Sequence, residues 1–70
     1  MKHPELFSKN LKTLRQERHL NQQQLANLVG VSQQCISEWE NGNTEPTLSA
    51  LWELSDALEI SIDELVGKSE

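Results

Sequence analysis

With 70 residues, the chain is long enough for one small domain, which buries only about 60% of the surface that its unfolded form exposes. The single cysteine excludes an internal disulfide, favours a reducing cytoplasm and argues against a cysteine-based metal site. No apolar run approaches the roughly 20 residues that cross a bilayer, so we expect one soluble, cytoplasmic domain over residues 1–70. Its net charge of −5 disfavours non-specific attraction to polyanions.

The first predicted helix covers residues 4–19. Pro4 suits the first position of a helix, because a proline has no N–H that the helix would need there, and Glu5 follows near the positive end of the helix dipole. Apolar residues then recur at helical spacing and predict one wall of the core: Phe7, Leu11 and Leu14, with Leu6 alongside them.

The second predicted helix begins after Asn21 and ends at Gly30. Asn21 and Gln24 have the spacing of a capping box, in which each side chain accepts a backbone N–H of the other residue. Gly30 can take the left-handed conformation that stops a helix without a Cβ clash. The apolar stripe between these two ends predicts the buried face: Leu25, Ala26 and Val29.

The third predicted helix runs from Gln33 to Asn41. Ser32 is a suitable N-cap, and Gly42 follows the helix as a stop. Ile36 and Trp39 are expected to fill the gap beneath this helix. Two short helices joined by a tight turn over residues 22–41 predict a helix-turn-helix, a unit that places its second helix in the major groove of DNA.

The polar residues of the third helix lie on the face away from Ile36 and Trp39. Glutamine can pair with both N6 and N7 of adenine, so two adjacent glutamines just after the turn suggest base contacts. Glu38 is equally compatible with accepting from cytosine N4 and with being a solvated charge. Cys35 either meets a thymine methyl or sits half-buried. The candidate base contacts are Gln33, Gln34, Ser37 and Glu38.

The fourth predicted helix spans residues 48–58. Pro46 forces the residue before it out of helical geometry, and Thr47 caps the helix that follows. Trp52 lies off the main stripe, and we interpret it as a cover of the core, with a partner surface as the alternative. The apolar edge is expected to consist of Leu48, Leu51, Leu54 and Leu58.

A short fifth helix is predicted over residues 62–66. Ser61 and Glu64 have the spacing of a second capping box. The apolar residues of this region either return to the core or form a dimer surface, with Trp52 as a further candidate for that surface. They are Ile60, Ile62, Leu65 and Val66.

These motifs together resemble the phage repressor and Cro (Xre-like) helix-turn-helix family of transcriptional regulators. The resemblance covers residues 11–65, LKTLRQERHLNQQQLANLVGVSQQCISEWENGNTEPTLSALWELSDALEISIDEL, and is far more specific than a bare helix-turn-helix. It implies an all-α, compact five-helix fold like the lambda repressor DNA-binding domain, with the third helix as the reader of the major groove.

The resemblance also assigns roles to individual residues. It implies a partly buried ion pair between Arg15 and Glu40, which ties the reader helix to the first helix. At the family's base-contacting positions stand Gln33, Gln34 and Glu38. Contacts to the DNA backbone are implied for Gln22, for Lys12 or Gln16, and for Asn41. We also expect one from Asn43.

The sequence departs from this family in its charge. Asn43 and Glu45 stand in a loop where DNA-binding relatives often carry lysine or arginine, and Glu38 adds negative charge to the reader. Residues 1–20 nevertheless carry a net charge of +3, against −8 in residues 21–70. Exposed charges more than about 10 Å apart are largely screened at 0.1 M salt, so acidic residues on the side of the domain away from the DNA are compatible with DNA binding. We expect a weak dependence of DNA binding on salt and poor binding by a monomer.

The function expected from the sequence is sequence-specific regulation of transcription, by a homodimer that binds a two-fold DNA operator and represses. No cofactor, metal or small-molecule ligand is expected. The sequence shows no pairing of nucleophile and base and no glycine-rich phosphate loop, which argues against an enzyme. The alternative is an antitoxin or protein-interaction module that keeps the fold and has weak DNA affinity, as the acidity favours.

Overall fold

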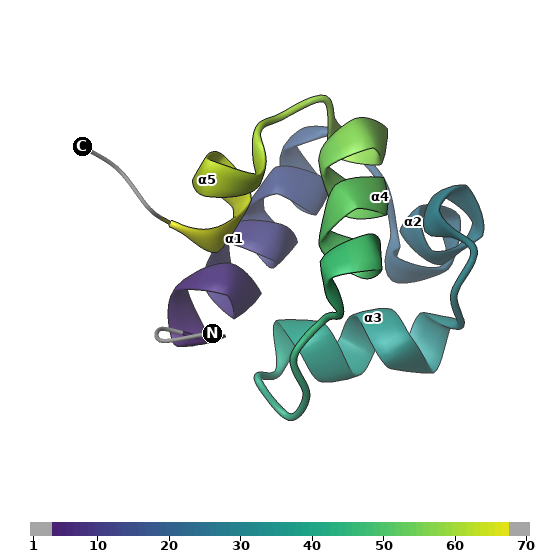
Figure 1. The fold of residues 1–70 in the computed structure, drawn as a ribbon. Coiled ribbons are helices and arrows are strands. Elements are labelled where there is room, and N and C mark those ends of the chain that lie inside the picture. The colour runs from purple at the N-terminus through teal and green to yellow at the C-terminus, as the bar shows by residue number, and fades with distance from the viewer. Residues whose placement is uncertain (1–3, 68–70) are drawn as a thin grey trace.

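The computed structural model describes residues 4–67 and, within that range, consists of five helices without a strand. The all-α architecture that the sequence predicts is confirmed. Figure 1 shows α3 at one end of the molecule and α5 toward the other, with α4 running between them. The helices are α1 (Pro4–Glu17), α2 (Gln22–Val29), α3 (Gln33–Glu40), α4 (Leu48–Leu58) and α5 (Ile62–Val66).

Each of the last four helices begins at a side-chain cap that the sequence predicts. Asn21 and Gln24 form the complete capping box, with bonds in both directions. The second predicted box forms only in part. The Ser61 hydroxyl accepts from the N–H of Glu64, but the carboxylate of Glu64 accepts from that same hydroxyl instead of from the backbone. The two remaining caps are Ser32 and Thr47.

The first helix ends two residues earlier than the sequence predicts. His19 has a φ of 57°, and the N–H of Leu20 donates to the carbonyl of Arg15 at 3.2 Å. This arrangement closes a helix with a left-handed residue, a position that glycine usually takes, and a histidine therefore gave no stop signal. At the other predicted stop, Gly42 has a φ of 76° and ends α3 as expected, one residue short of the predicted boundary.

The core lies where α1, α2, α3 and α4 meet and extends to α5. Phe7 and Trp39 pack edge to face, with ring centroids 6.5 Å apart. Such a pair adds about 0.5–1.5 kcal/mol to the effect of burial alone. The buried apolar residues are Phe7, Leu11, Leu25, Ala26, Val29, Ile36, Trp39, Leu54, Leu58 and Leu65.

Two predictions for α4 are wrong. Leu48 is 73% exposed, so it does not belong to the apolar edge that packs on the core. Trp52, interpreted from the sequence as a core cover, is 62% exposed. Both residues lie on the same side of the helix, one turn apart, whereas Leu54 and Leu58 point inward. The apolar pattern is wider than the buried face, and packing against α2 and α5 selects the buried part of it.

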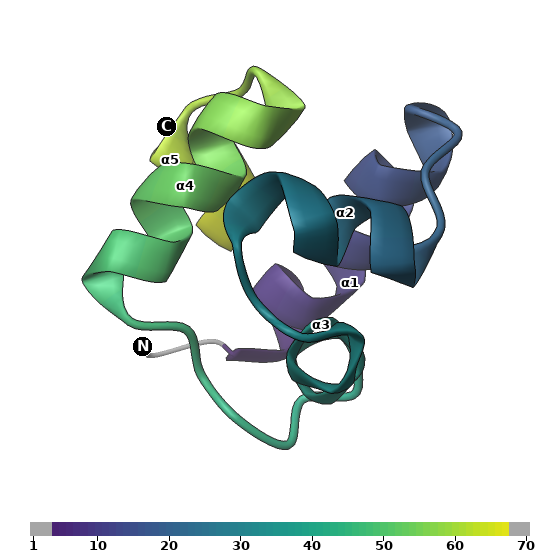
Figure 2. The same cartoon turned by 90° about the vertical axis from the view of Figure 1, so that its right-hand side faces the viewer.

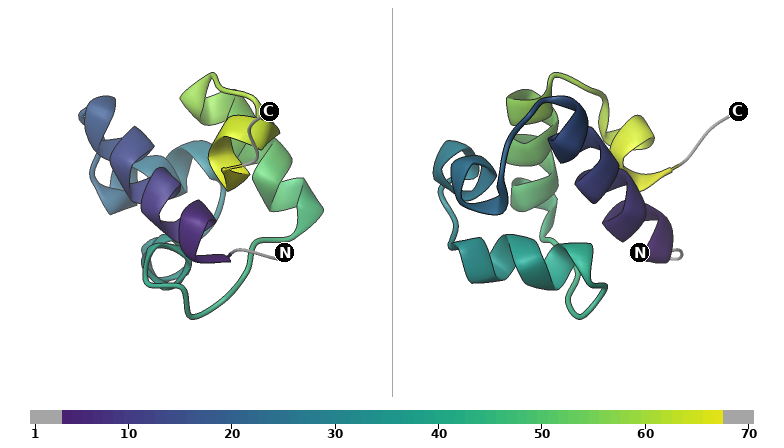
Figure 3. Two further views of the ribbon diagram at one scale, coloured as in Figure 1. Left: turned by 90° about the vertical axis from the view of Figure 1, so that its left-hand side faces the viewer. Right: turned by 180° about the vertical axis from the view of Figure 1, so that it is seen from behind.

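Polar contacts fasten α1 to elements far away in the sequence. The hydroxyl of Ser8, which is buried, donates to the carbonyl of Trp39 at 2.6 Å and so joins α1 to the end of α3. The Asn10 amide donates to the carbonyls of Glu64 and Leu65, at 3.3 and 3.4 Å. Figure 3 shows the resulting side-by-side placement of α1 and α5. No helix in residues 4–67 has both the length and the apolar character needed to cross a bilayer.

Candidate nucleic-acid interface

Arg15 and Glu40 join the outermost helix, α3, to α1 and to the loop before α2. The guanidinium Nε lies 2.6 Å from Oε2 of Glu40, and a second nitrogen donates to Oε1 at 3.1 Å. The third guanidinium nitrogen donates to the carbonyl of Leu20 at 2.7 Å. The two side chains are only 10% and 3% exposed. The hydrogen bond to Glu40 raises the pKa of Arg15, and burial opposes this increase only in part.

A chain of hydrogen bonds continues from this ion pair to the start of α3. The side-chain amide of Gln22 donates to Oε1 of Glu40 at 3.0 Å. The oxygen of the same amide accepts a hydrogen bond from Nε2 of Gln33. Gln22 is therefore half-buried between two partners. Its position fixes the first side chain of α3.

The residues expected to contact bases occupy the outer face of α3. Gln33 and Gln34 are exposed, and Ser37 and Glu38 are half-exposed. Figure 2 shows α3 end-on at the margin of the molecule with α2 on its inner side. Gln34 donates to the carboxylate of Glu38 at 3.4 Å, and Asn41 donates to the hydroxyl of Ser37 at the same distance. These four polar groups form a single open face.

Cys35 belongs to the inner side of this helix. It is half-buried against the core, as one of the two interpretations from the sequence has it. Burial raises the pKa of its thiol, and the nearby charge of Glu38 raises it further. A thiol in this setting stays protonated and acts as a small apolar group.

The residues expected to contact the DNA backbone lie at both ends of the helix-turn-helix and on α1. Lys12 and Gln16 are exposed one turn apart on α1. Asn41 and Asn43 are also exposed, but their backbone N–H groups already donate to the carbonyls of Ser37 and Glu38. Only the side chains of these two asparagines are therefore available to a phosphate.

The positive charge of the described residues is concentrated on α1. Arg15 is neutralised by Glu40, and Arg18 lies 4.0 Å from the carboxylate of Glu17. Lys9 and Lys12 are the exposed lysines of this helix. No lysine or arginine occurs in residues 19–67, so the outer face of α3 has polar groups and one carboxylate but no cation.

Sequence reasoning missed the two contacts that hold α3 from its ends. The bond between Gln22 and Gln33 depends on how the two helices cross, and neither glutamine differs from an ordinary exposed one in sequence. Ser8 carried one weak signal, because it follows the buried Phe7 on a helix face otherwise occupied by apolar residues. Its partner is a backbone carbonyl, which no side-chain motif reveals.

Comparison with known proteins identifies a family and individual relatives of this chain. The family described as Helix-turn-helix matches residues 11–65. The cryptic phage CTXphi transcriptional repressor RstR of Vibrio cholerae is 37% identical over 65 residues, which are 93% of this chain and 59% of RstR. The transcriptional activator BcrR of Enterococcus faecalis is 38% identical over 64 residues, which are 91% of this chain and 31% of BcrR.

The fold has a counterpart bound to DNA. The c2 repressor of Salmonella phage P22, solved in complex with a synthetic operator, has a TM-score of 0.86 and 36% identity, and the match covers 91% of this chain and 97% of that one. By contrast, the chain spans 59% or less of the full lengths of RstR and BcrR.

Proposed function

Because this chain belongs to the helix-turn-helix family, we propose that it is a sequence-specific DNA-binding regulator of transcription that lays α3 in the major groove. The observation that carries the proposal is the open polar face of α3, whose first side chain, Gln33, is held in place through Gln22. A DNA-binding role also agrees with the cytoplasmic location that we expect from the sequence.

The held position of Gln33 is compatible with reading adenine. A glutamine amide has two N–H groups and an acceptor oxygen. One N–H of Gln33 donates to Gln22, which leaves the second N–H for N7 of adenine and the oxygen for the N6 amino group. The amide can therefore make both base contacts without breaking its bond to Gln22. A side chain fixed before binding loses less entropy on binding.

The next positions on the same face set the rest of the sequence preference. Gln34 and Glu38 are weakly bonded to each other, and a base edge can replace that bond. Glu38 accepts from the N4 amino group of cytosine in this proposal, whereas Gln34 can pair with adenine. Ser37 reaches either a base or a phosphate. One good bidentate pair discriminates against a wrong base by about 1–3 kcal/mol.

Contacts to the DNA backbone position the reader. The first turn of α2 presents backbone N–H groups without intrahelical partners, a setting that suits a phosphate. Of these N–H groups, the side chain of Asn21 accepts a hydrogen bond only from that of Gln24. The further contacts that we propose come from the side chains of Gln22, Lys12, Gln16, Asn41 and Asn43. Since few of these are cations, we expect a shallower salt dependence than the 6–10 phosphate contacts of typical DNA-binding proteins produce.

We propose a homodimer on a two-fold operator, because one short polar helix reads too few bases alone. Half-sites about 34 Å apart would put two copies of α3 in successive major grooves. Leu65 is fully buried, so the part of the predicted dimer surface that relied on it is wrong. The half-buried residues that remain for this contact are Ile60, Ile62 and Val66. Repression by blocking polymerase is the sense of regulation that we favour.

One observation favours a second function. The net charge is −5, and residues 19–67 contain no lysine or arginine, which disfavours contact with DNA and suits a protein-interaction module or antitoxin of the same fold. Such a module would bind duplex DNA weakly and with no preference between sequences.

Selection of bound sequences from random DNA duplexes tests the proposal. We expect the full chain to enrich a two-fold motif with adenine at the position of Gln33, and Gln33→Ala to lose the preference at that position. The exposed Gln23→Ala is a matched control, because it removes a glutamine amide from α2 outside the chain of bonds that ends at Gln33. Failure to enrich any sequence, or an unchanged preference in Gln33→Ala, would rule out this reader.

A further inference from the structure

Trp52 is the largest apolar side chain that the described residues leave open to solvent, with 62% of its surface exposed. Leu48, one turn earlier on α4, is 73% exposed and extends the apolar strip. A tryptophan contributes strongly to binding when a partner covers it, and aromatic residues of this kind dominate the energy of protein interfaces. The strip is therefore a candidate contact surface.

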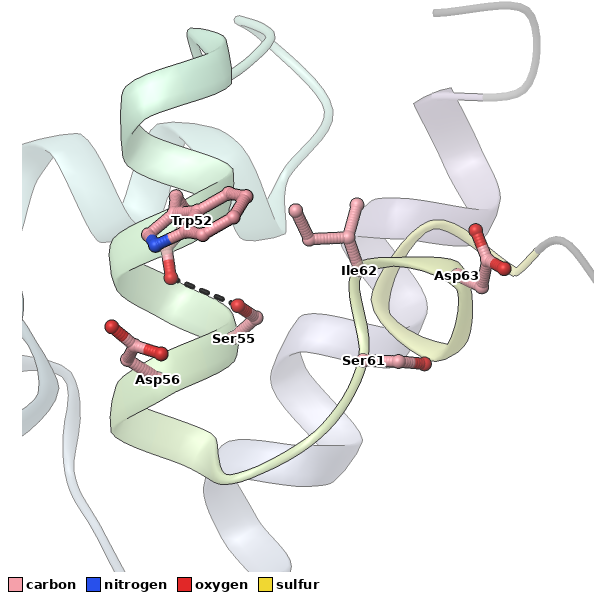
Figure 4. A pocket seen from close by; sticks show the side chains of 6 residues that line it. All are labelled: Trp52, Ser55, Asp56, Ser61, Ile62 and Asp63. Atoms are coloured by element: carbon pink, nitrogen blue, oxygen red, sulfur yellow. Dashed lines mark hydrogen bonds between the residues drawn. The ribbon is translucent and has the colours of Figure 1, made fainter.

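The strip borders a hollow between α4 and α5 with a volume of about 350 Å³. Figure 4 shows the ring of Trp52 and the side chain of Ile62 pointing toward each other across it. The hydroxyl of Ser55 donates to the carbonyl of Trp52 at 2.9 Å, so this polar group already has a partner. The hollow is lined by Trp52, Ser55, Asp56, Ser61, Ile62 and Asp63. We call this hollow, with Leu48, the α4–α5 groove.

The α4–α5 groove is acidic. Residues 48–66 contain five carboxylates and no lysine or arginine. Asp56 and Asp63 belong to the lining itself, one from each helix. Within residues 4–67, neither carboxylate takes part in an ion pair. An apolar floor between two unpaired acidic walls is complementary to a ligand that has both an apolar anchor and positive charges.

We propose that the α4–α5 groove binds a basic amphipathic helix of a protein partner. A bulky apolar side chain of the partner packs between Trp52 and Ile62, and its lysines or arginines lie beside Asp56 and Asp63. This is the helix-in-groove mode of recognition, in which apolar anchors recur along one face of the bound helix. Ile62 also belongs to the homodimer contact that we propose above, so the partner competes with a second copy of this chain for that residue. The partner is the better occupant of the groove itself, because a symmetric contact there would bring the acidic walls of two copies together.

The groove and the reader are separate surfaces. α3 lies at one end of the molecule (Figure 1), and no residue of α3 lines the hollow between α4 and α5 (Figure 4). A partner seated on Trp52 therefore leaves the outer face of α3 open. The proposed partner site does not require that the chain bind DNA, and it can be tested without an operator.

A pair of synthetic peptides tests the proposal on the full chain. The first is an amphipathic helix with leucine at helical spacing on one face and lysine elsewhere, and the second replaces every lysine by glutamate. Calorimetric titration should show binding of the lysine peptide only. Trp52→Ala should weaken that binding by about tenfold or more. Asp56→Asn combined with Asp63→Asn should weaken it several-fold and reduce its salt dependence.

Leu28→Ala is the matched control, because Leu28 is 59% exposed on α2, outside the groove. This variant should bind the lysine peptide within twofold of the unchanged chain. Circular dichroism checks that Trp52→Ala is folded, as expected for a change at an exposed position. Equal binding of the two peptides, equal binding by Trp52→Ala, or no binding at all would overturn the proposal. A Trp52→Ala variant that loses only self-association, measured by sedimentation, would assign the groove to a second copy instead.

Discussion

The hydroxyl of Ser8 and the carbonyl of Trp39, 31 residues apart, form a buried hydrogen bond of 2.6 Å that fastens the end of α3 to α1. Ser8→Ala removes this donor and should lower the free energy of unfolding by about 1 kcal/mol, the usual net contribution of such a bond. Urea unfolding measures the change. Ser49→Ala, at an exposed position of α4, should change it by no more than about 0.5 kcal/mol. Equal effects of the two substitutions would contradict a structural role for Ser8.

The ion pair between Arg15 and Glu40 should be the most sensitive site for stability. Glu40→Ala leaves a buried guanidinium without its carboxylate, and we expect a loss of about 3–5 kcal/mol in the free energy of unfolding. Glu17→Ala, which removes an exposed partner of Arg18, should cost about 1 kcal/mol at most. Replacing both members together, as Arg15→Met with Glu40→Leu, should recover much of the loss. No recovery would mean that the charges themselves stabilise the fold.

Gln22 and Gln33 should act as a unit in DNA binding. On the operator that selection identifies, Gln33→Ala should cost about 1–3 kcal/mol of affinity. Gln22→Ala frees the side chain of Gln33 and should cost about 0.5–1.5 kcal/mol. In the background of Gln33→Ala, Gln22→Ala should cost less, because only the proposed phosphate contact of Gln22 is left to lose. A double-mutant cycle by fluorescence anisotropy measures this coupling, and strictly additive losses would show that the two glutamines act independently.

Glu59 offers a way to stabilise the chain. It ends α4 in the left-handed conformation, with a φ of 58°, which strains a residue that has a Cβ. Glu59→Gly should therefore raise the free energy of unfolding by about 1 kcal/mol. Glu53→Gly, in the exposed interior of the same helix, should lower it by a similar amount. Thermal unfolding distinguishes the two, and destabilisation by both would mean that Glu59 makes a compensating contact.

The thiol of Cys35 should react slowly with iodoacetamide. Burial and Glu38 raise its pKa, so at pH 8 the folded chain has less thiolate than the chain unfolded in urea, which is the control. Because the folded state holds this proton more tightly, the contribution of Cys35 to stability is complete below the pKa of the unfolded thiol and declines as pH rises above it. Equal reaction rates in the folded and unfolded chains would contradict this assignment.

Local chemistry made the helix starts predictable. The caps at Asn21, Ser32, Thr47 and Ser61 depend on residues within three positions of each other, and all four accept the expected backbone N–H. The end of α1 was not predictable in the same way. Its stop is His19, which takes the left-handed conformation that glycine usually takes at this position, so the residue type gave no signal of the boundary.

The outward and inward sides of α4 show the limit of periodicity. An apolar stripe predicts that a helix has a buried face, but it does not say how much of the stripe the neighbouring helices cover. Leu54 and Leu58 are covered, whereas Leu48 and Trp52 are not. For the reader helix, Ile36 and Trp39 fix the orientation without ambiguity, so the open polar face of α3 was predictable. The bond between Gln33 and Gln22 was not, because it depends on the crossing of two helices.

α3 has only eight residues, and a helix that short is unstable in water by itself. Contacts with the rest of the molecule hold it in place: Gln22 bonds to its start, Ser8 bonds to its end, and the core packs beneath it. None of these supports involves Gln34, Ser37 or Glu38. Those three positions can therefore be varied with little risk to folding, and a library varied there alone is the natural starting point for changing the operator sequence that we propose α3 reads.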